Sequence, residues 1–405
     1  MIRSALDYIP MSNSAFLGSI VDSFNPYRPE AFIKYKNKES ILGYSCRSLF
    51  DTIMNYYKSK NENLKILTTP IHHTSFRNII EKYVDPNNIF ILDMNESFNE
   101  ITALPKCLKN NQIDLCIISH MFGQDLKMDI IKDFKINNPN CIIIEDRVQG
   151  GYFFKEFSHD FINIALYSTG MDKKPCALGG GFVYIKNDFY QNEELKIYVK
   201  NKINNYPQQY FYHRIINLIN KIPTFLIYNS KLILCGLFNI FNYFKIDINN
   251  FAVKYRKNYP GFFHNDYNKN PSNGTLTSIY KSLKRVSDIE YQYYTVSNKF
   301  FNALDTNTKK KFFPWVKNNY LLTPYNTISV ENTDDFCNFL KKNNIVSIKN
   351  PTWKMFNFEY KNSDYHETFN NSLVYIPSLP IMNDSEINFL AIKIKEYYKI
   401  KFDYS

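Results

Sequence analysis

Two polar segments that follow apolar runs carry the residues of this 405-residue chain best suited to chemistry. The first run ends in Asp146, and Gln149 follows three residues later. The second run ends in Ser168 and is followed by Lys173 and by the glycines 179–181. A carboxylate facing a pyridine nitrogen, and an amine that forms a Schiff base with an aldehyde, are what pyridoxal phosphate (PLP) requires of a protein. The order and spacing of these residues therefore predict a PLP site.

Asp146 has two interpretations. A carboxylate at the end of a strand stabilises a protonated pyridine nitrogen by opposite charge at short range. It also commonly caps the turn that follows a strand. Gln149 favours the first interpretation, because its amide would reach the ring oxygen of the cofactor from the same turn.

Two adjacent lysines compete for the role of Schiff-base lysine. Lys173 would attack the aldehyde as a neutral amine and, once released, would carry a proton between cofactor and substrate carbons. The alternative is that Lys173 is a solvated loop lysine. Lys174 is its direct rival, because only one of two neighbouring side chains points inward.

The elements around these residues alternate as in a mostly parallel α/β sheet between about residues 40 and 190. The expected strands are 64–68, 89–92, 115–119, 141–145, 164–168 and 181–185. Two expected helices begin near Ser45 and near Thr74, and a third spans about 128–137. Ligands of open α/β sheets bind beyond the carboxyl ends of the strands. The residues that fall at or just past such ends are His72, His73, His120, Asp146 and Ser168.

The same residues resemble the motifs of the DegT/DnrJ/StrS family of PLP-dependent nucleotide-sugar aminotransferases, which have the aspartate aminotransferase fold (fold type I). That family carries Asp-x-x-Gln after an apolar strand and Ser-x-x-x-x-Lys before a glycine pair. The matching residues here are Asp146 and Gln149, Ser168 and Lys173, and Gly180 and Gly181. The register of the resemblance selects Lys173 over Lys174 as the catalytic lysine, with Asp146 as its partner.

Further segments extend the resemblance over most of 40–190 and, more faintly, over 255–400. The segment that begins with His120 resembles the family's His-x-x-Gly-Gln, and 43–49 resembles the start of its first large-domain helix. The resemblance implies that the backbone amides of Ser45, Cys46 and Arg47 meet the cofactor phosphate, as the N-terminus of a helix readily does. It also implies that the hydroxyl of Ser168 joins them.

Three positions stay open or depart from the family pattern. The aromatic residue that stacks on the cofactor ring is His72, His73 or Phe76; spacing favours His73, against a histidine that merely starts a helix. Gly179 stands where many members have Glu. Arg147 replaces a small residue; an exposed strand-end arginine is expected there, with contact to the substrate as the alternative.

The resemblance implies transfer of an amino group from an amino acid, glutamate by analogy, to a keto-sugar linked to a nucleotide, in a homodimer. A sugar dehydratase is a rival, although the usual dehydratase has His where this chain has Lys173. The second rival is a catalytically altered or silent relative that binds at a membrane surface.

The chain divides into an expected large PLP-binding domain, 1–255, and a smaller C-terminal α/β domain, 256–405. The large domain contains an insertion at about 190–255. Its apolar part, 215–244, breaks into pieces too short to span a bilayer. A helical insertion packed on the protein or its dimer partner is favoured over a peripheral membrane surface and over a true span. The C-terminal domain is expected to contain a long helix (274–305), strands at 325–330, 345–348 and 372–376, and helices at 334–343 and 384–398.

Composition narrows the class of protein further. The formal charge of +11 favours anionic partners, but no basic run is interleaved with aromatic residues, so nucleic acid is not expected. Seven cysteines without metal-ligand spacing predict buried thiols in a reducing compartment and no metal site. Residues 1–10 contain an acid and a proline where a signal peptide needs an apolar run, so a cytoplasmic location is expected.

Overall fold

The computed structural model describes most of the chain between Met11 and Asp403. The described residues are 11–24, 32–35, 38–106, 108, 112–150, 154–170, 173–187, 190–209, scattered positions from 214 to 244, 267–318, 320–323, 326–349, 353–356, 363–377, 379 and 382–403. The expected domain boundary at 255 and 256 and much of the expected insertion at 190–255 lie outside these residues.

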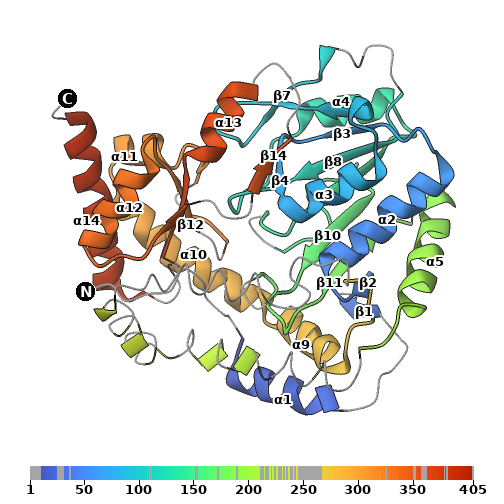
Figure 1. Ribbon diagram of the computed structural model, residues 1–405, viewed down its shortest axis with the longest axis horizontal. Helices are drawn as coiled ribbons and strands as arrows, with labels where there is room; N and C mark the ends of the chain where they lie inside the picture. The colour runs from blue at the N-terminus through green and yellow to red at the C-terminus, as the bar shows by residue number, and fades with distance from the viewer. Residues whose placement is uncertain are drawn as a thin grey trace.

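An eight-stranded sheet forms the centre of the larger part of the molecule (Figure 1). Its strands lie in the order β1-β2-β11-β10-β9-β8-β3-β5. Neighbouring strands from β10 to β5 pair in parallel, and β11, β2 and β1 continue the sheet as antiparallel strands. The strands are β1 (Phe32–Tyr35), β2 (Lys38–Gly43), β3 (Ile66–Thr68), β5 (Ile89–Ile91), β8 (Leu115–Ser119), β9 (Ile142–Asp146), β10 (Ile164–Ser168) and β11 (Gly181–Ile185).

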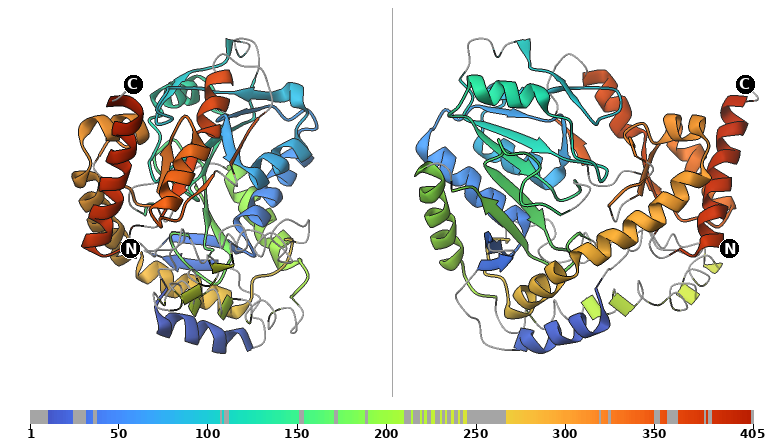
Figure 2. Two further views of the ribbon diagram at one scale, coloured as in Figure 1. Left: turned by 60° about the vertical axis from the view of Figure 1, so that its left-hand side comes forward. Right: turned by 180° about the vertical axis from the view of Figure 1, so that it is seen from behind.

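Helices cover both faces of this sheet, as expected for the fold (Figure 2). Apolar side chains of α2, α3 and α5 pack on one face, and those of α4 and α9 pack on the other. β8 and β9 are buried along their whole length, because strands covered on both faces need apolar side chains on both. The helices are α2 (Cys46–Lys60), α3 (Thr74–Tyr83), α4 (Asp129–Asn137), α5 (Tyr190–Asn204) and α9 (Asn273–Lys284).

A smaller antiparallel sheet, in the order β12-β15-β13, forms the centre of the C-terminal part. α14 begins with a capping box in which Asn383 and Glu386 satisfy each other's backbone amides. The elements are α10 (Val286–Ala303), α11 (Thr306–Phe312), β12 (Asn326–Ser329), α12 (Thr333–Lys342), β13 (Ile348–Lys349), α13 (Ser363–Asn371), β15 (Leu373–Ile376), α14 (Asp384–Tyr398) and a terminal π-helix, Lys399–Asp403.

Two strand pairs lie outside the two larger sheets. β4 (Ile71–His73) pairs with β14 (Trp353–Met355), and β6 (Asp93–Met94) pairs with β7 (Ile101–Ala103). The β4 and β14 pair brings β14 against α3 on one side and α13 of the C-terminal part on the other. A 3₁₀ helix spans Pro86–Asn88, and α1 (Asn13–Phe24) packs along α9.

The expected long helix at 274–305 is wrong in one respect, because the chain forms two helices there. Arg285, with φ −109° and ψ 3°, leaves the helical conformation between α9 and α10. The two helices have different packing partners. Ile279 of α9 packs against the large sheet, whereas Phe300 and Phe301 of α10 pack in the core shared with the C-terminal sheet. The change of packing partner explains why the chain does not continue as one straight helix.

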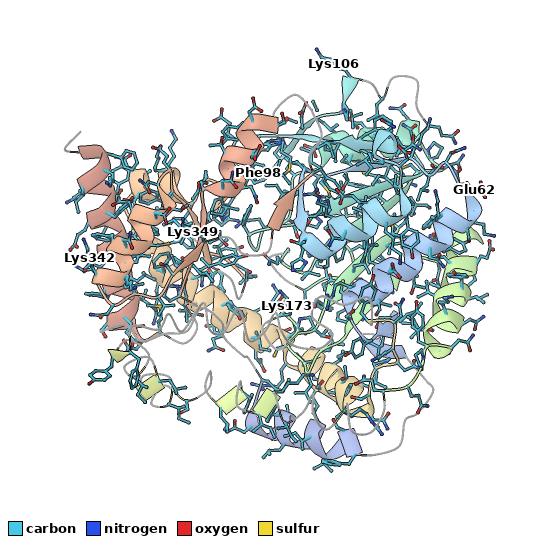
Figure 3. The ribbon with its side chains drawn as sticks, in the orientation of Figure 1. Glu62, Phe98, Lys106, Lys173, Lys342 and Lys349 are labelled. Carbon is cyan, nitrogen blue, oxygen red and sulfur yellow. The ribbon has the colours of Figure 1, made fainter. Side chains whose placement is uncertain are left out.

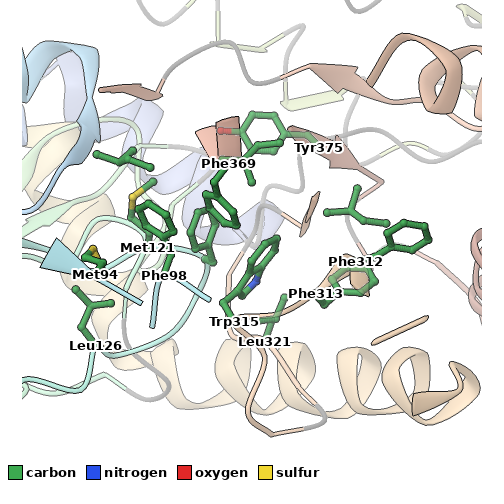
Figure 4. Close-up of a cluster of buried hydrophobic side chains, with 14 of the residues drawn as sticks. Met94, Phe98, Met121, Leu126, Phe312, Phe313, Trp315, Leu321, Phe369 and Tyr375 are labelled. Carbon is green, nitrogen blue, oxygen red and sulfur yellow. The ribbon is translucent and has the colours of Figure 1, made fainter. Parts of the chain in front are cut away.

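One apolar core connects the two sheets. Phe98 stacks on Phe369 of α13 with ring centroids 4.3 Å apart, and Phe122 stacks on Trp315 at 4.6 Å. Figure 4 shows Phe98, Phe369 and Trp315 between Met121, which follows β8, and residues of the C-terminal part such as Phe313. The larger and smaller parts of the molecule are therefore packed into each other.

The expected apolar insertion is described only at scattered positions. Phe225 is buried and stacks on Phe16 of α1, with ring centroids 3.9 Å apart. No helix in the described part of the chain is both long enough and apolar enough to cross a bilayer.

Candidate active site

Asp146 is the last residue of β9 and is almost completely buried. It pairs with Ser119 of β8 and Leu166 of β10, in the middle of the parallel strands. Its Oδ1 accepts a hydrogen bond of 3.0 Å from the backbone amide of Val148, so Asp146 does cap the turn that follows. Burial raises the pKa of Asp146 to about 6, although the Val148 amide and the positive charge of Lys173 oppose the shift. A buried carboxylate in this state would be stabilised as an anion by a cation placed beside it.

Gln149 occupies the same turn and contributes an unused hydrogen-bond acceptor. Its backbone carbonyl accepts a hydrogen bond of 2.8 Å from the amide of Gly123. Its side-chain Oε1 is buried and has no hydrogen-bond partner in the described part of the chain. Buried polar atoms are almost always satisfied, so an unsatisfied one needs an explanation. A polar ligand group at this place would supply the missing partner.

The two lysines have different surroundings. Lys173 is half-buried, and Figure 3 shows it near the middle of the molecule, between the two sheets. Its positive charge lowers the pKa of Asp146, so the two groups lie close enough to interact. Lys174 is buried and forms an ion pair of 3.2 Å with Glu290 of α10. The amine of Lys174 is therefore committed to another partner.

The N-terminus of α2 lies next to these groups. Ser45 is its N-cap: the Ser45 hydroxyl accepts a hydrogen bond from the amide of Ser48, and the Ser48 hydroxyl accepts one from the amide of Ser45. The expectation that the Ser45 amide meets a phosphate is thus not matched here, because that amide is already used. The amides of Cys46 and Arg47 lie in the first turn of the helix, where N–H groups suit an anion.

Cys46 shows that the separate segments share one neighbourhood. Burial raises the pKa of its thiol well above the usual value, the negative charge of Asp146 raises it further, and the positive charges of Arg47 and Lys173 lower it. The first turn of α2 therefore lies within electrostatic reach of both Asp146 and Lys173. Ser168, at the end of β10, pairs with Gly181 of β11 at the same edge of the sheet.

The glycines explain how α2 approaches the sheet so closely. A Cβ at Gly181 would lie 2.5 Å from the Cys46 nitrogen and 2.7 Å from the carbonyl oxygen of Tyr167, so only glycine fits there. Gly179 and Gly180 have φ values of 124° and 92°, which side chains rarely tolerate. The glycine triplet thus shapes the turn after Lys173 and brings β11 against the start of α2.

The structure separates the candidates for the stacking aromatic. The ring of His72 is buried and its Nε2 contacts the hydroxyls of Thr68 and Thr69; burial lowers its pKa to about 3, so the ring is neutral. Phe76 is buried and stacks on Phe50. His73 is half-buried and is the N-cap of α3, where its Nδ1 accepts a hydrogen bond from the amide of Ser75. Of the three, His73 alone is not enclosed in the core.

His120 and Arg147 belong to a buried network of charges. His120 uses both ring nitrogens: Nδ1 accepts a hydrogen bond from the amide of Leu126, and Nε2 lies 3.0 Å from Glu145. Arg147 forms ion pairs with Glu145 at 3.4 Å and with Asp125 at 3.3 Å. The expected exposed arginine is therefore wrong, because Arg147 is only 2% exposed.

Sequence reasoning missed Glu145 and Asp125 in this network. A signal was present, because Glu145 directly follows three isoleucines in a buried strand, and a buried carboxylate needs a cationic or hydrogen-bonding partner. The network lies directly behind Asp146 in the sequence and supports the end of β9.

Comparison with solved structures gives the fold. The chain is similar to the aminotransferase PseC of Helicobacter pylori, which is involved in the biosynthesis of pseudoaminic acid: the TM-score is 0.63, the identity 12%, and 98% of this chain and 99% of that one are covered. It is also similar to a DegT/DnrJ/EryC1/StrS aminotransferase of Brucella abortus, with a TM-score of 0.59, 11% identity, and 95% and 94% covered. A third match is a Streptococcus pneumoniae protein solved in its PLP form, with a TM-score of 0.64, 11% identity, and 98% and 99% covered.

The chain has the fold of these aminotransferases. The expected α/β architecture, with a large mostly parallel sheet and a smaller C-terminal unit, is thereby confirmed. No protein-family profile and no curated protein matches the sequence at a significant level. The likeness is one of fold over nearly the whole chain, at about one identical residue in nine.

Proposed function

We propose that the protein is a PLP-dependent aminotransferase. The observation that carries the proposal is the meeting of Asp146, Lys173 and the first turn of α2 at one edge of the sheet, where Gln149 holds an unsatisfied buried oxygen. An acid for the ring nitrogen, an amine for the aldehyde and helix amides for the phosphate are the groups that PLP needs. The fold and its PLP-bound neighbour support the same cofactor.

Each residue has a distinct part in this proposal. When bound, PLP supplies the electron sink that makes carbon–nitrogen exchange feasible. Asp146 keeps the ring nitrogen protonated, and Gln149 orients the ring through its free oxygen. Lys173 holds the aldehyde carbon and moves the proton in both halves of the transfer. The amides of Cys46 and Arg47, with the hydroxyl of Ser168, bind the phosphate.

His73 and His120 have supporting parts. We assign to His73 the role of covering one face of the ring, because the other two candidates are buried in the core. His120 acts through its contact with Glu145, which stabilises the end of β9 beneath Asp146.

The resemblance and the fold support a proposal for the substrates. We infer an amino acid donor, glutamate, and a keto-sugar acceptor linked to a nucleotide. The positive net charge suits an acceptor that carries phosphates, and PseC, with the same fold, is an aminotransferase involved in the biosynthesis of pseudoaminic acid. Lys173 favours amino transfer over sugar dehydration, for which the usual residue is His.

A homodimer in a reducing, cytoplasmic environment completes the proposal. α1 exposes Leu17, Val21 and Phe24, three large apolar side chains that an interface between two copies would cover. Four of the five described cysteines are buried, as thiols in a reducing environment commonly are. Val21→Glu should convert the dimer to a monomer in sedimentation velocity experiments, and an unchanged sedimentation coefficient would contradict the proposed use of α1.

The cofactor is tested directly. The purified protein with added PLP should show a visible absorption band that borohydride abolishes, and mass mapping should place the fixed PLP on Lys173. The Lys173→Ala variant should show neither the band nor the modified peptide. A wild-type protein without the band would contradict the enzyme proposal, and a band that survives in Lys173→Ala would contradict the assignment of the lysine.

The acceptor is tested by a screen. Keto-sugar nucleotides are paired with glutamate and other amino acids, and the aminated sugar is detected by mass spectrometry. A product from a keto-sugar nucleotide, absent with Lys173→Ala, is expected. Amination of free keto acids alone would contradict the sugar substrate and leave the aminotransferase assignment in place.

A further inference from the structure

Lys174 takes part in a contact that the proposed reaction does not require. Its Nζ lies 3.2 Å from Oε1 of Glu290 and donates a hydrogen bond of 2.9 Å to the backbone carbonyl of Leu322. Both charged side chains are more than nine-tenths buried. Burial lowers the pKa of Lys174 and raises that of Glu290, and each shift is opposed by the charge of the partner. Because desolvation offsets much of the attraction in such pairs, stability alone explains this one poorly.

The partner segment at Leu322 also touches the other half of the candidate site. A Cβ at Gly123 would lie 3.0 Å from the side chain of Thr323 and 3.3 Å from the amide nitrogen of Leu322. The amide of Gly123 donates to the carbonyl of Gln149 at 2.8 Å. The loop that carries Lys173 thus reaches Leu322 through Lys174, and the turn of Gln149 reaches Leu322 and Thr323 through Gly123.

The segment at Leu322 packs in turn against α10. The side chain of Leu322 packs with Ile289 and Tyr293, which flank Glu290 along the helix. The amine of Lys174 therefore contacts two points of one packed unit, the carboxylate of Glu290 and the carbonyl of Leu322. An ammonium with three donors suits such a divided contact.

We propose that Lys174 is a positioning residue for Lys173. Its contacts with Glu290 and Leu322 fix the loop against α10, so that the neighbouring amine faces Asp146 at a set distance from the turn of Gln149. The inference rests on the proposed function, because it gives Lys173 the role of cofactor lysine. It adds that the second lysine of the pair is a tether, whose partners lie more than a hundred residues away in the sequence.

The test separates positioning from stability. Lys174→Met leaves Glu290 as a buried unpaired carboxylate and should lower the urea midpoint of unfolding. The double variant Lys174→Met/Glu290→Met replaces both charges with apolar groups of similar size and should restore the midpoint, as replacement of a buried pair often does. Each protein is loaded with PLP, and the rate at which borohydride fixes PLP to Lys173 is followed by mass mapping of peptides.

The double variant is expected to match the wild type in urea midpoint and in PLP content, yet to fix PLP to Lys173 at least tenfold more slowly. A wild-type fixation rate in the double variant would overturn the inference, because the pair would then serve folding alone. PLP fixed on Lys174 in the wild type would also overturn it. The control Lys299→Met, which removes an exposed ion pair on the same helix, should leave all three readouts unchanged.

Two further outcomes are informative. If Lys174→Met and the double variant do not fold, Glu290→Gln takes their place, because it preserves the shape and removes only the charge. It should slow fixation at least threefold, and a wild-type rate would overturn the inference. If the wild type fixes no PLP on any lysine, the proposed function fails and the inference fails with it, before any variant is compared.

Discussion

At the scale of single residues, the burial of Asp146 has a consequence for pH. Its folded pKa of about 6 lies above the ordinary value of 3.8, so the folded cofactor-free protein binds this proton more tightly than the unfolded chain does. The group therefore contributes stability at low pH, and that contribution is lost as pH rises from about 4 to about 6. The loss amounts to about 3 kcal/mol by pH 7.

Asp146→Asn should remove this dependence. Relative to wild type, the cofactor-free variant should gain stability at pH 7 and gain little at pH 4, as measured by urea unfolding at both values. The exposed Asp133→Asn serves as the control and should follow the wild type. In the PLP-loaded protein the same change should reduce the rate of amino transfer on the order of a hundredfold, because the opposite charge beside the ring nitrogen is lost. Equal stability of wild type and Asp146→Asn at both pH values would contradict the burial argument.

Loss of the Arg147 side chain should lower the stability of the folded state. Arg147→Met would leave Glu145 and Asp125 without their buried cation. Breaking a buried pair by removing one partner costs about 3–5 kcal/mol, which urea unfolding would detect as a lower midpoint. Lys127→Met, which removes a cation from two more exposed carboxylates, should lower the midpoint far less, because solvent screens an exposed pair. Similar losses for the two variants would show that the network around Arg147 is not a buried one.

At the scale of elements, the turn after Lys173 depends on the absence of a side chain at Gly181. Gly181→Ala would place a methyl group 2.5 Å from the nitrogen of Cys46 and 2.7 Å from the carbonyl oxygen of Tyr167. Backbone atoms must then move, and the first turn of α2 would shift away from β11. We expect a loss of about 1–3 kcal/mol in stability and at least tenfold weaker PLP binding in a fluorescence titration.

Gly236 provides the matched control for that substitution. A Cβ there would meet no atom of the described residues within 4 Å, so Gly236→Ala should change neither stability nor PLP affinity. If Gly181→Ala binds PLP as tightly as the control does, then the close approach of β11 to α2 does not shape the phosphate site.

The elements also show which parts of the fold the sequence could predict. Continuous apolar runs gave β8, β10 and β11 with their observed bounds, and the start of α2 was recognisable from Ser45. The pairing of β4 with β14 was not predictable, because it joins short strands that are about 280 residues apart and have no periodicity of their own. The break at Arg285 was not predictable either, because it follows from the different packing partners of α9 and α10, which the local sequence does not encode.

The candidate site was predictable to a similar degree. Asp146, Gln149 and Lys173 stood out by residue type and spacing after apolar runs. The partners of Lys174 and Arg147 did not, because Glu290 and Asp125 reach them only through the tertiary fold. The register of the resemblance favoured Lys173 over Lys174 as the Schiff-base lysine. The structure gives a physical reason for this preference, because the amine of Lys174 is engaged by Glu290.

At the scale of the whole molecule, the aromatic core between the two sheets should make unfolding cooperative. Phe369 of α13 stacks on Phe98 with ring centroids 4.3 Å apart and meets the edge of Trp315 at 5.7 Å. Because these rings come from both parts of the chain, neither sheet can lose its packing without exposing apolar surface of the other. We therefore expect one calorimetric transition for the wild type, with equal calorimetric and van't Hoff enthalpies.

Phe369→Ala tests this coupling. The cavity should lower stability by about 3–5 kcal/mol, and the weakened contact should separate the transition of the C-terminal part from that of the large sheet. Glu367→Ala, at an exposed position of the same helix, should leave a single transition near the wild-type temperature. Two transitions in the wild type itself would contradict the cooperative core. Lys174, on the side of the large sheet, binds Glu290 of α10, and the C-terminal end of α10 packs in the aromatic core. Separate unfolding of the C-terminal part should therefore also slow the fixation of PLP to Lys173.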